Sequence, residues 1–226
     1  MTFSIAGICA RTGQVGFAVT TSSVAVGARV GAALARTGVV LSQARTDPRL
    51  NTVGLRRIAA GASAREALES MIGAAVGAQW RQLGVLLADG TIAVHTGHGC
   101  TDHGGHVGGT RCLALGNALR SHAVLDAMVA CFEAGEARPL CDRLIAALAA
   151  GAGAGGEWTA LQSSSVRVFT EDEFPYADLR IDKSGTPIAD LARLWEDFAP
   201  KADAYRQRAL DPEHSPPATE IEAPRG

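Results

Sequence analysis

The second residue of the chain, Thr2, is the one whose type and position best suit covalent chemistry. It stands at the start of a segment, residues 1–7, that alternates like a β-strand and reads MTFSIAG. If Met1 is removed, the Thr2 hydroxyl and a free α-amine belong to one residue, which joins a nucleophile to its own base. Such a pair can cleave amide bonds. The alternative is that Thr2 is an ordinary strand residue.

A nucleophile of this kind needs hydrogen-bond donors aimed at the oxyanion that develops on the attacked carbonyl. Asn117 follows Gly116 at the end of a predicted strand, and its side-chain amide is the predicted donor. The alternative is that Gly116 and Asn117 only form a turn.

Hydroxyl side chains after other predicted strands are candidates for binding substrate. Thr20, Thr21 and Ser22 follow the second strand, which would run antiparallel to the first, so we expect them to flank Thr2. Ser42 on a third strand is a further candidate. The alternative is that these are polar turn residues.

Cationic groups near the first strands are all arginines. The chain has two lysines, Lys183 and Lys201, and neither lies in the early strands. Arg29, Arg36 or Arg45 would have to supply positive charge, and an arginine binds carboxylates well but carries protons poorly. This pattern favours an acidic or polar small substrate.

A rival site lies in the glycine-rich segment from His95 to His106, which reads HTGHGCTDHGGH. His95 and His106 are candidates for binding substrate, and His106 could act as a general acid because histidine titrates near neutrality. The segment could instead hold zinc and make the protein a metal-dependent hydrolase or a metal-binding protein, although the spacing matches no standard zinc motif. The ligands would be His98, Cys100, His103 and His106.

Alternating and helical patterns supply the elements that would position these residues. Residues 3–9 and 14–20 predict a β-hairpin, 39–43 a buried strand, and 82–88 with 91–95 a second hairpin around an Asp-Gly turn. Further strands are expected at 111–115 and 164–169. Helical patterns occupy 49–60, a segment opened by a Ser63–Glu66 capping box, two segments between 121 and 150, and one from Thr186 to Phe198. Alternating strand pairs and helix pairs favour sheets between helical layers.

Composition limits the class of protein. The 226 residues are 47% hydrophobic and carry a net charge of −2, without a basic stripe or a bilayer-spanning apolar run, so we expect neither nucleic acid nor a membrane as a partner. Five cysteines without framework spacing, and no secretory signal, predict a cytoplasmic protein with reduced thiols. A homodimer is the default expectation for the assembly.

An ordered set of short motifs carries a resemblance to a known family. The motifs cover residues 2–5, 25–27, 94–97, 105–106, 116–117, 155–156 and 162–164. In this order and spacing they resemble the bacterial proteins of domain-of-unknown-function family 1028, which are regarded as N-terminal-nucleophile (Ntn) hydrolases. The resemblance spans residues 2 to 198. It implies an α+β fold, a four-layer αββα sandwich with antiparallel sheets between helical layers, and it favours a catalytic Thr2.

The sequence departs from the family pattern where a substrate pocket is expected, at residues 20–24 and 98–103, so substrate identity is not carried over. We therefore expect a single Ntn-hydrolase-like domain over residues 1–200 and a frayed polar tail over 201–226. The predicted function is hydrolysis of a small amide, cyclic amide or acyl-amino compound, without a cofactor. The alternatives are the metal-dependent protein and a non-catalytic small-molecule-binding protein on the same fold.

Overall fold

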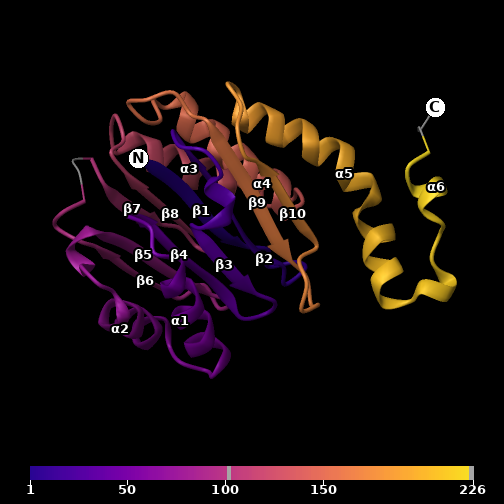
Figure 1. Cartoon of the computed structure of the whole chain (residues 1–226), viewed down its shortest axis with the longest axis horizontal. Helices are drawn as coiled ribbons and strands as arrows, with labels where there is room; N and C mark the ends of the chain where they lie inside the picture. Colours follow the sequence, from indigo (N-terminus) through magenta and orange to yellow (C-terminus); the bar gives the residue numbers. More distant parts are fainter. Residues whose placement is uncertain (101–102, 224–226) are drawn as a thin grey trace.

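Two antiparallel β-sheets lie face to face between layers of helices (Figure 1) in the computed structural model, which describes residues 1–100 and 103–223. The order of the six-stranded sheet is β10 (Ala177–Ile181), β9 (Ser163–Phe169), β2 (Val15–Thr21), β1 (Thr2–Ile8), β8 (Cys112–Asn117) and β7 (Gly105–Gly108). The order of the four-stranded sheet is β3 (Gly31–Leu34), β4 (Gly38–Ala44), β5 (Arg81–Leu87) and β6 (Ile92–Thr96).

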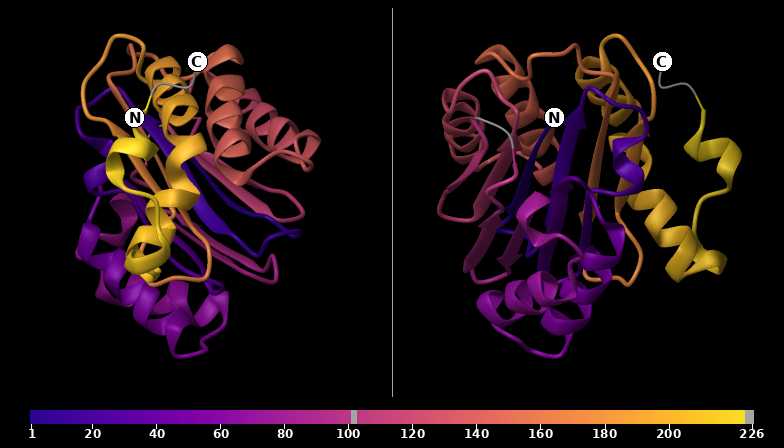
Figure 2. Two further views of the ribbon diagram at one scale, coloured as in Figure 1. Left: turned by 90° about the vertical axis from the view of Figure 1, so that its right-hand side faces the viewer. Right: turned by 60° about the vertical axis from the view of Figure 1, so that its left-hand side comes forward.

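Helices cover the outer face of each sheet, as the two further views also show (Figure 2). The four-stranded sheet is covered by α1 (Pro48–Ala59) and α2 (Ala64–Ala74). The six-stranded sheet is covered by α3 (Ala123–Ala134), α4 (Leu140–Gly153) and the first half of α5 (Pro187–Leu210). The result is the four-layer αββα sandwich that the sequence predicts, and the α+β fold class is confirmed.

Alternation along β1 decides what each of its side chains faces. Phe3 and Ile5 pack in the core beneath α3 and α4. Ala6 and Ile8 pack in a second core between the two sheets. Because successive strand side chains point to opposite faces, Thr2 falls on the face that looks toward the other sheet. The central strand of the larger sheet therefore begins with a hydroxyl in the inter-sheet layer.

Most of the predicted elements are present. The first hairpin pairs Phe3 with Thr20, and Asp89 and Gly90 join β5 to β6. The capping box forms as expected: the Ser63 hydroxyl accepts from the Glu66 amide at 3.3 Å, and the Glu66 carboxylate accepts from the Ser63 amide at 2.9 Å. Strands β3, β7 and β10 are not predicted from the sequence, and all three are edge strands.

The end of the chain differs from the expected boundary at residue 200. Helix α5 continues to Leu210, and the chain then turns back through the short helix α6 (Ala218–Ile221). Lys201 Nζ donates to Glu222 Oε2 at 2.8 Å, and the Tyr205 hydroxyl donates to the same carboxylate. In the described part of the chain, no helix combines the length and the apolar character that a membrane crossing requires.

Two glycines should respond oppositely to alanine because the two sheets approach closely at one of them. A Cβ on Gly84 would lie 2.8 Å from Leu115 Cδ1 of the facing sheet, whereas one on Gly73 of α2 would meet open space. We expect Gly84→Ala to destabilise the fold by about 1–3 kcal/mol through overpacking. Gly73→Ala should stabilise it by up to about 1 kcal/mol through helix propensity. Urea unfolding measures both, and equal effects of the two substitutions would contradict the close approach.

Candidate active site at the start of the central strand

The side chain of Thr2 meets polar groups from both neighbouring strands. In the sheet register Thr2 lies opposite Asn117 of β8. On the other side, the hydroxyl oxygens of Thr2 and Thr21 are 3.2 Å apart. All three residues are almost fully buried. The structure thus brings together three of the residues that the sequence suggests, on the inner face of one sheet.

Met1 covers this group of side chains. Its carbonyl oxygen accepts a hydrogen bond from the Thr2 hydroxyl at 2.5 Å and another from the Thr21 hydroxyl. Met1 itself is 43% exposed, while Thr2 beneath it is 6% exposed. Removal of Met1 would therefore free both hydroxyls and place the Thr2 α-amine beside them.

The Asn117 side chain is held by a buried glutamine of the opposite sheet. Asn117 Nδ2 donates to Gln82 Oε1 at 3.2 Å. Gln82 Nε2 in turn lies within hydrogen-bond distance of the carbonyl oxygens of Gly116 (2.9 Å) and Gly105 (3.0 Å). An amide nitrogen carries two hydrogens, so Asn117 keeps a second N–H for another acceptor.

The same network continues beneath Thr2. Gln43 Nε2 donates to Gln82 Oε1 at 2.8 Å, and the Ser4 hydroxyl donates to Gln43 Oε1 at 2.7 Å. Ser4, Gln43 and Gln82 are each 0% exposed. None of the three is among the site residues that the sequence predicts. A signal for Gln43 and Gln82 was available in the sequence. Both lie in strands, at positions that alternate with the helix-facing residues, so their side chains would point between the two sheets.

A buried carboxyl, also absent from the predicted site, lies beside the start of β1. Glu157 is 5% exposed, and its Oε2 accepts from the Ser22 amide at 3.1 Å. Its Oε1 is buried and has no hydrogen-bond partner among the described residues. Gly155 and Gly156 precede it with φ of +127° and +57°, conformations that favour glycine. This turn directs the chain from α4 toward the chain start.

Burial dominates the electrostatics of Glu157. Desolvation raises the pKa of its carboxyl to about 7, against the opposing effects of the Ser22 hydrogen bond and the positive α-amino group of Met1. A carboxyl that titrates near neutrality and lies within electrostatic reach of the chain start is placed to exchange or share a proton there.

The raised pKa of Glu157 predicts a pH-dependent stability. The unfolded chain loses this proton near pH 4.5 and the folded chain near pH 7, so the folded state binds more protons between these values and stability falls as pH rises. The expected loss is roughly 3 kcal/mol for the protein that retains Met1. Urea unfolding at pH 4.5 and 7.5, on protein expressed with methionine aminopeptidase inhibited, measures it.

Two substitutions separate this effect from other titrations. Glu157→Gln should remove most of the loss of stability. Glu133→Gln is the matched control, because Glu133 also accepts from a backbone amide, Thr110 N at 2.8 Å, in another part of the molecule. A loss of stability that persists unchanged in Glu157→Gln would contradict the assignment.

Two of the predicted hydroxyl residues lie on the other faces of their sheets. Thr20 pairs with Phe3, faces the helices and donates to the Ser163 carbonyl at 2.9 Å. Ser42 lies next to α1, where its hydroxyl accepts from the Asp47 amide at 3.4 Å. The structure does not bring either side chain to Thr2. Ser22 does lie beside the site, and it contributes its backbone amide to Glu157.

The predicted histidines also lie away from Thr2. His95 faces outward on β6, with its Nε2 3.0 Å from the Ala78 carbonyl oxygen. His106 on β7 is exposed and lines a separate pocket with residues of α2 and β6. Within the part of the chain that the structure describes, neither side chain has a contact that would support a role at the Thr2 hydroxyl.

The four candidate zinc ligands do not form a cluster in the described structure. His98 is exposed, and Cys100 Sγ donates to the Arg81 carbonyl at 3.4 Å. Among the residues described, no group of three or more His, Cys, Asp or Glu side chains is arranged to hold a metal ion. His103 and His106 therefore belong to no such group. Thr101 and Asp102 of the same segment lie outside the described residues.

The three arginines suggested as sources of positive charge are engaged elsewhere. Arg36 forms an ion pair with Glu171, and the guanidinium of Arg45 lies 4.1 Å from the Trp80 ring centre. Arg29 lies closest along the chain to Ser22, but its guanidinium already donates to two backbone carbonyls and to the Ser23 hydroxyl. The described structure therefore gives no support to an acidic substrate.

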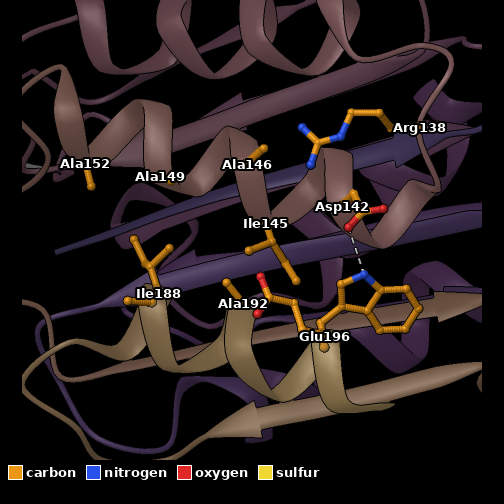
Figure 3. Close-up of a pocket in the computed structure, with 11 residues that line it drawn as sticks. Arg138, Asp142, Ile145, Ala146, Ala149, Ala152, Ile188, Ala192 and Glu196 are labelled. Atoms are coloured by element: carbon orange, nitrogen blue, oxygen red, sulfur yellow. Dashed lines mark hydrogen bonds between the residues drawn. The ribbon is translucent and has the colours of Figure 1, made fainter. Parts of the chain in front are cut away.

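An apolar pocket of about 450 Å³ lies between α4 and α5 (Figure 3). Ile145 of α4 and Ile188 of α5 line it, and Trp195 Nε1 donates to Asp142 Oδ1 at 3.0 Å. The pocket is on the helical side of the six-stranded sheet, whereas Thr2 faces the other sheet. It is separate from the candidate site.

The family model DUF1028, described as a family of unknown function, matches residues 2–191. The crystal structure of a Silicibacter pomeroyi protein of this family is similar, with a TM-score of 0.81, 32% identity, and coverage of 88% of this chain and 89% of that one.

Anbu (ancestral beta-subunit) from Yersinia bercovieri is only distantly similar, with 10% identity and a TM-score of 0.39 over 91% of this chain and 97% of that one. The search of curated proteins found no match. The family match and the 32% identity to the Silicibacter pomeroyi protein together establish that the chain belongs to the DUF1028 family.

Proposed function

We propose that the protein is an N-terminal-nucleophile hydrolase that cleaves a carbon–nitrogen amide bond with Thr2 after removal of Met1. The observation that carries the proposal is the position of Thr2. Its hydroxyl lies on the inner face of the central strand, 3.2 Å from the Thr21 hydroxyl and opposite Asn117, with Met1 over it. The family resemblance implies an αββα sandwich together with Ntn-hydrolase chemistry, and the presence of this architecture supports the same function.

In the proposed reaction the Thr2 oxygen attacks the substrate carbonyl carbon while the Thr2 α-amine takes the hydroxyl proton. The second N–H of Asn117 donates to the resulting oxyanion. The ammonium then returns its proton to the leaving nitrogen as the carbon–nitrogen bond breaks, which leaves an ester on Thr2. Water attacks this ester, and the products are a carboxylic acid, an amine and the regenerated threonine.

The network around Gln82 supports the role of Asn117. An oxyanion donor acts best when it is fixed before the reaction. Gln82 holds one N–H of Asn117 and is itself bound to backbone carbonyls of both β7 and β8. The substrate class that we propose is a small amide, a cyclic amide or an acyl-amino compound.

The test has two steps. Intact mass spectrometry of the purified protein should show a mass lower by one methionine residue, and an Edman cycle should release threonine first. The processed protein should then release a primary amine from members of a panel of acyl-amino acids, small amides and lactams. Complete retention of Met1, or a processed protein inert on all members, would count against the proposal.

A further inference from the structure

We propose that the Glu157 carboxylate binds the α-ammonium group of Thr2 once Met1 is removed, and so holds the base of the reaction in place. The inference rests on the proposed function for its catalytic meaning, but the binding itself is a structural claim that does not require turnover. The geometry at the end of β1 carries it.

The sheet register places Glu157 next to the new chain start. The pairing of Phe3 with Thr20 puts Thr2 beside Thr21, and it puts the place of Met1 beside Ser22. The Ser22 amide donates to Glu157 Oε2 instead of to β1. The nitrogen of Thr2 lies at the junction between these two positions, since it bonds directly to the Met1 carbonyl carbon.

The unpartnered oxygen of Glu157 also points to a missing donor. Its Oε1 is buried without a hydrogen bond among the described residues, which is costly for a carboxylate. Removal of Met1 takes away a carbonyl that fills this end of the strand and creates an ammonium with three N–H donors. An ammonium beside Oε1 would satisfy the carboxylate and neutralise its charge.

The surroundings leave the α-amine as the cation for this carboxylate. Among the described residues, the charged side chain that contacts the same segment is Arg120, whose Nε donates to the backbone carbonyl of Glu157 at 3.0 Å. Its guanidinium lies 5.2 Å from the Trp158 ring centre. Among the described groups, the α-amino group of Met1 is the cation whose charge lowers the pKa of the Glu157 carboxyl, and removal of Met1 moves the α-amine one residue along the chain, to Thr2.

This contact would assist the first proton transfer of the proposed reaction, in which the α-amine acts as the base. When the α-amine takes the Thr2 hydroxyl proton, it becomes an ammonium, and a carboxylate beside it stabilises that charge. The proton then passes from nitrogen to the leaving group, and Glu157 neither gains nor loses one overall. The amine and the carboxyl would titrate as a coupled pair.

The experiment measures the pKa of the Thr2 amine directly. A cleavable fusion whose removal leaves Thr2 first provides the processed protein, and ¹⁵N-threonine labelling allows the amine to be titrated by NMR. Glu157→Gln should lower the amine pKa by about one unit or more. Glu133→Gln should leave it unchanged. An unaltered amine pKa in Glu157→Gln, or an equal shift in the control, would overturn the inference.

If Glu157→Gln does not fold, a second measurement on the unsubstituted protein tests the same inference. In the unsubstituted protein the Glu157 carboxyl carbon and the Thr2 nitrogen should show the same two titration steps. Independent single steps would overturn the inference. Both readouts are independent of substrate, so a protein that shows the pairing but cleaves no amide would refute the proposed function and leave this inference standing.

Discussion

Thr2→Ala should lower the hydrolysis rate by at least about a thousandfold, because it removes the nucleophile and leaves only substrate binding and the oxyanion donor. The α-amine remains in this variant, so the loss reports the hydroxyl alone. Thr2→Ser keeps both groups and should retain measurable activity. The measurement is kcat/KM on whichever amide of the panel is cleaved fastest, with processing of each variant confirmed by intact mass.

Thr20→Val is the matched control for the nucleophile. Thr20 lies on the adjacent strand, but its hydroxyl faces the helices and donates to the Ser163 carbonyl. We expect a loss of stability of about 1–2 kcal/mol from the missing buried hydrogen bond, with no change in kcat. A Thr2→Ala protein as active as the Thr20→Val protein would rule out the Thr2 mechanism.

Gln82→Leu should destabilise the fold by about 3 kcal/mol or more, because it removes one end of several buried hydrogen bonds at once. The amides of Gln43 and Asn117 would lose their shared acceptor. Two backbone carbonyls would lose the Gln82 amide as a donor. Urea unfolding gives the stability, and the same variant should be slower in hydrolysis because Asn117 is no longer held.

Two further variants test whether the network is the cause. Gln207→Leu removes one exposed hydrogen bond, from Nε2 to the His214 carbonyl, and should change stability by less than about 0.5 kcal/mol. In the double variant Gln43→Leu with Gln82→Leu, both partners of one bond are gone, so the loss should be smaller than the sum of the single losses. Strict additivity would show that the two side chains act independently.

The parts of the fold that sequence could predict are those with strong local signals. The Asp89-Gly90 turn and the Ser63–Glu66 capping box each specify their own geometry within a few residues. The edge strands β3 and β7 contain GAAL and GHVG, whose small residues carry no clear alternation. Their pairing depends on a neighbouring strand on one side only, which a local pattern does not reveal.

The residues of the candidate site also divide into those that local sequence signals could predict and those that they could not. Thr2, Thr21 and Asn117 were predictable because strand ends and antiparallel pairing bring them together. Thr20 and Thr21 are neighbours in β2, but their side chains point to opposite faces of the sheet, and only Thr21 reaches Thr2. Which of the two does so depends on which face of the sheet packs on helices. Glu157 was out of reach because its place beside the chain start is set by contacts between segments more than a hundred residues apart in sequence.

Because the Met1 carbonyl accepts hydrogen bonds from both the Thr2 and Thr21 hydroxyls, the initiator residue blocks the site until it is removed. Under the proposed mechanism, a preparation with incomplete methionine removal is a mixture of two populations, one competent and one inert, with the same fold. The specific activity of such a preparation would be proportional to the fraction of processed molecules, and it would underestimate the turnover number of each processed molecule. Burst titration with an acylating reagent, compared with the processed fraction from intact mass, should give a slope of one.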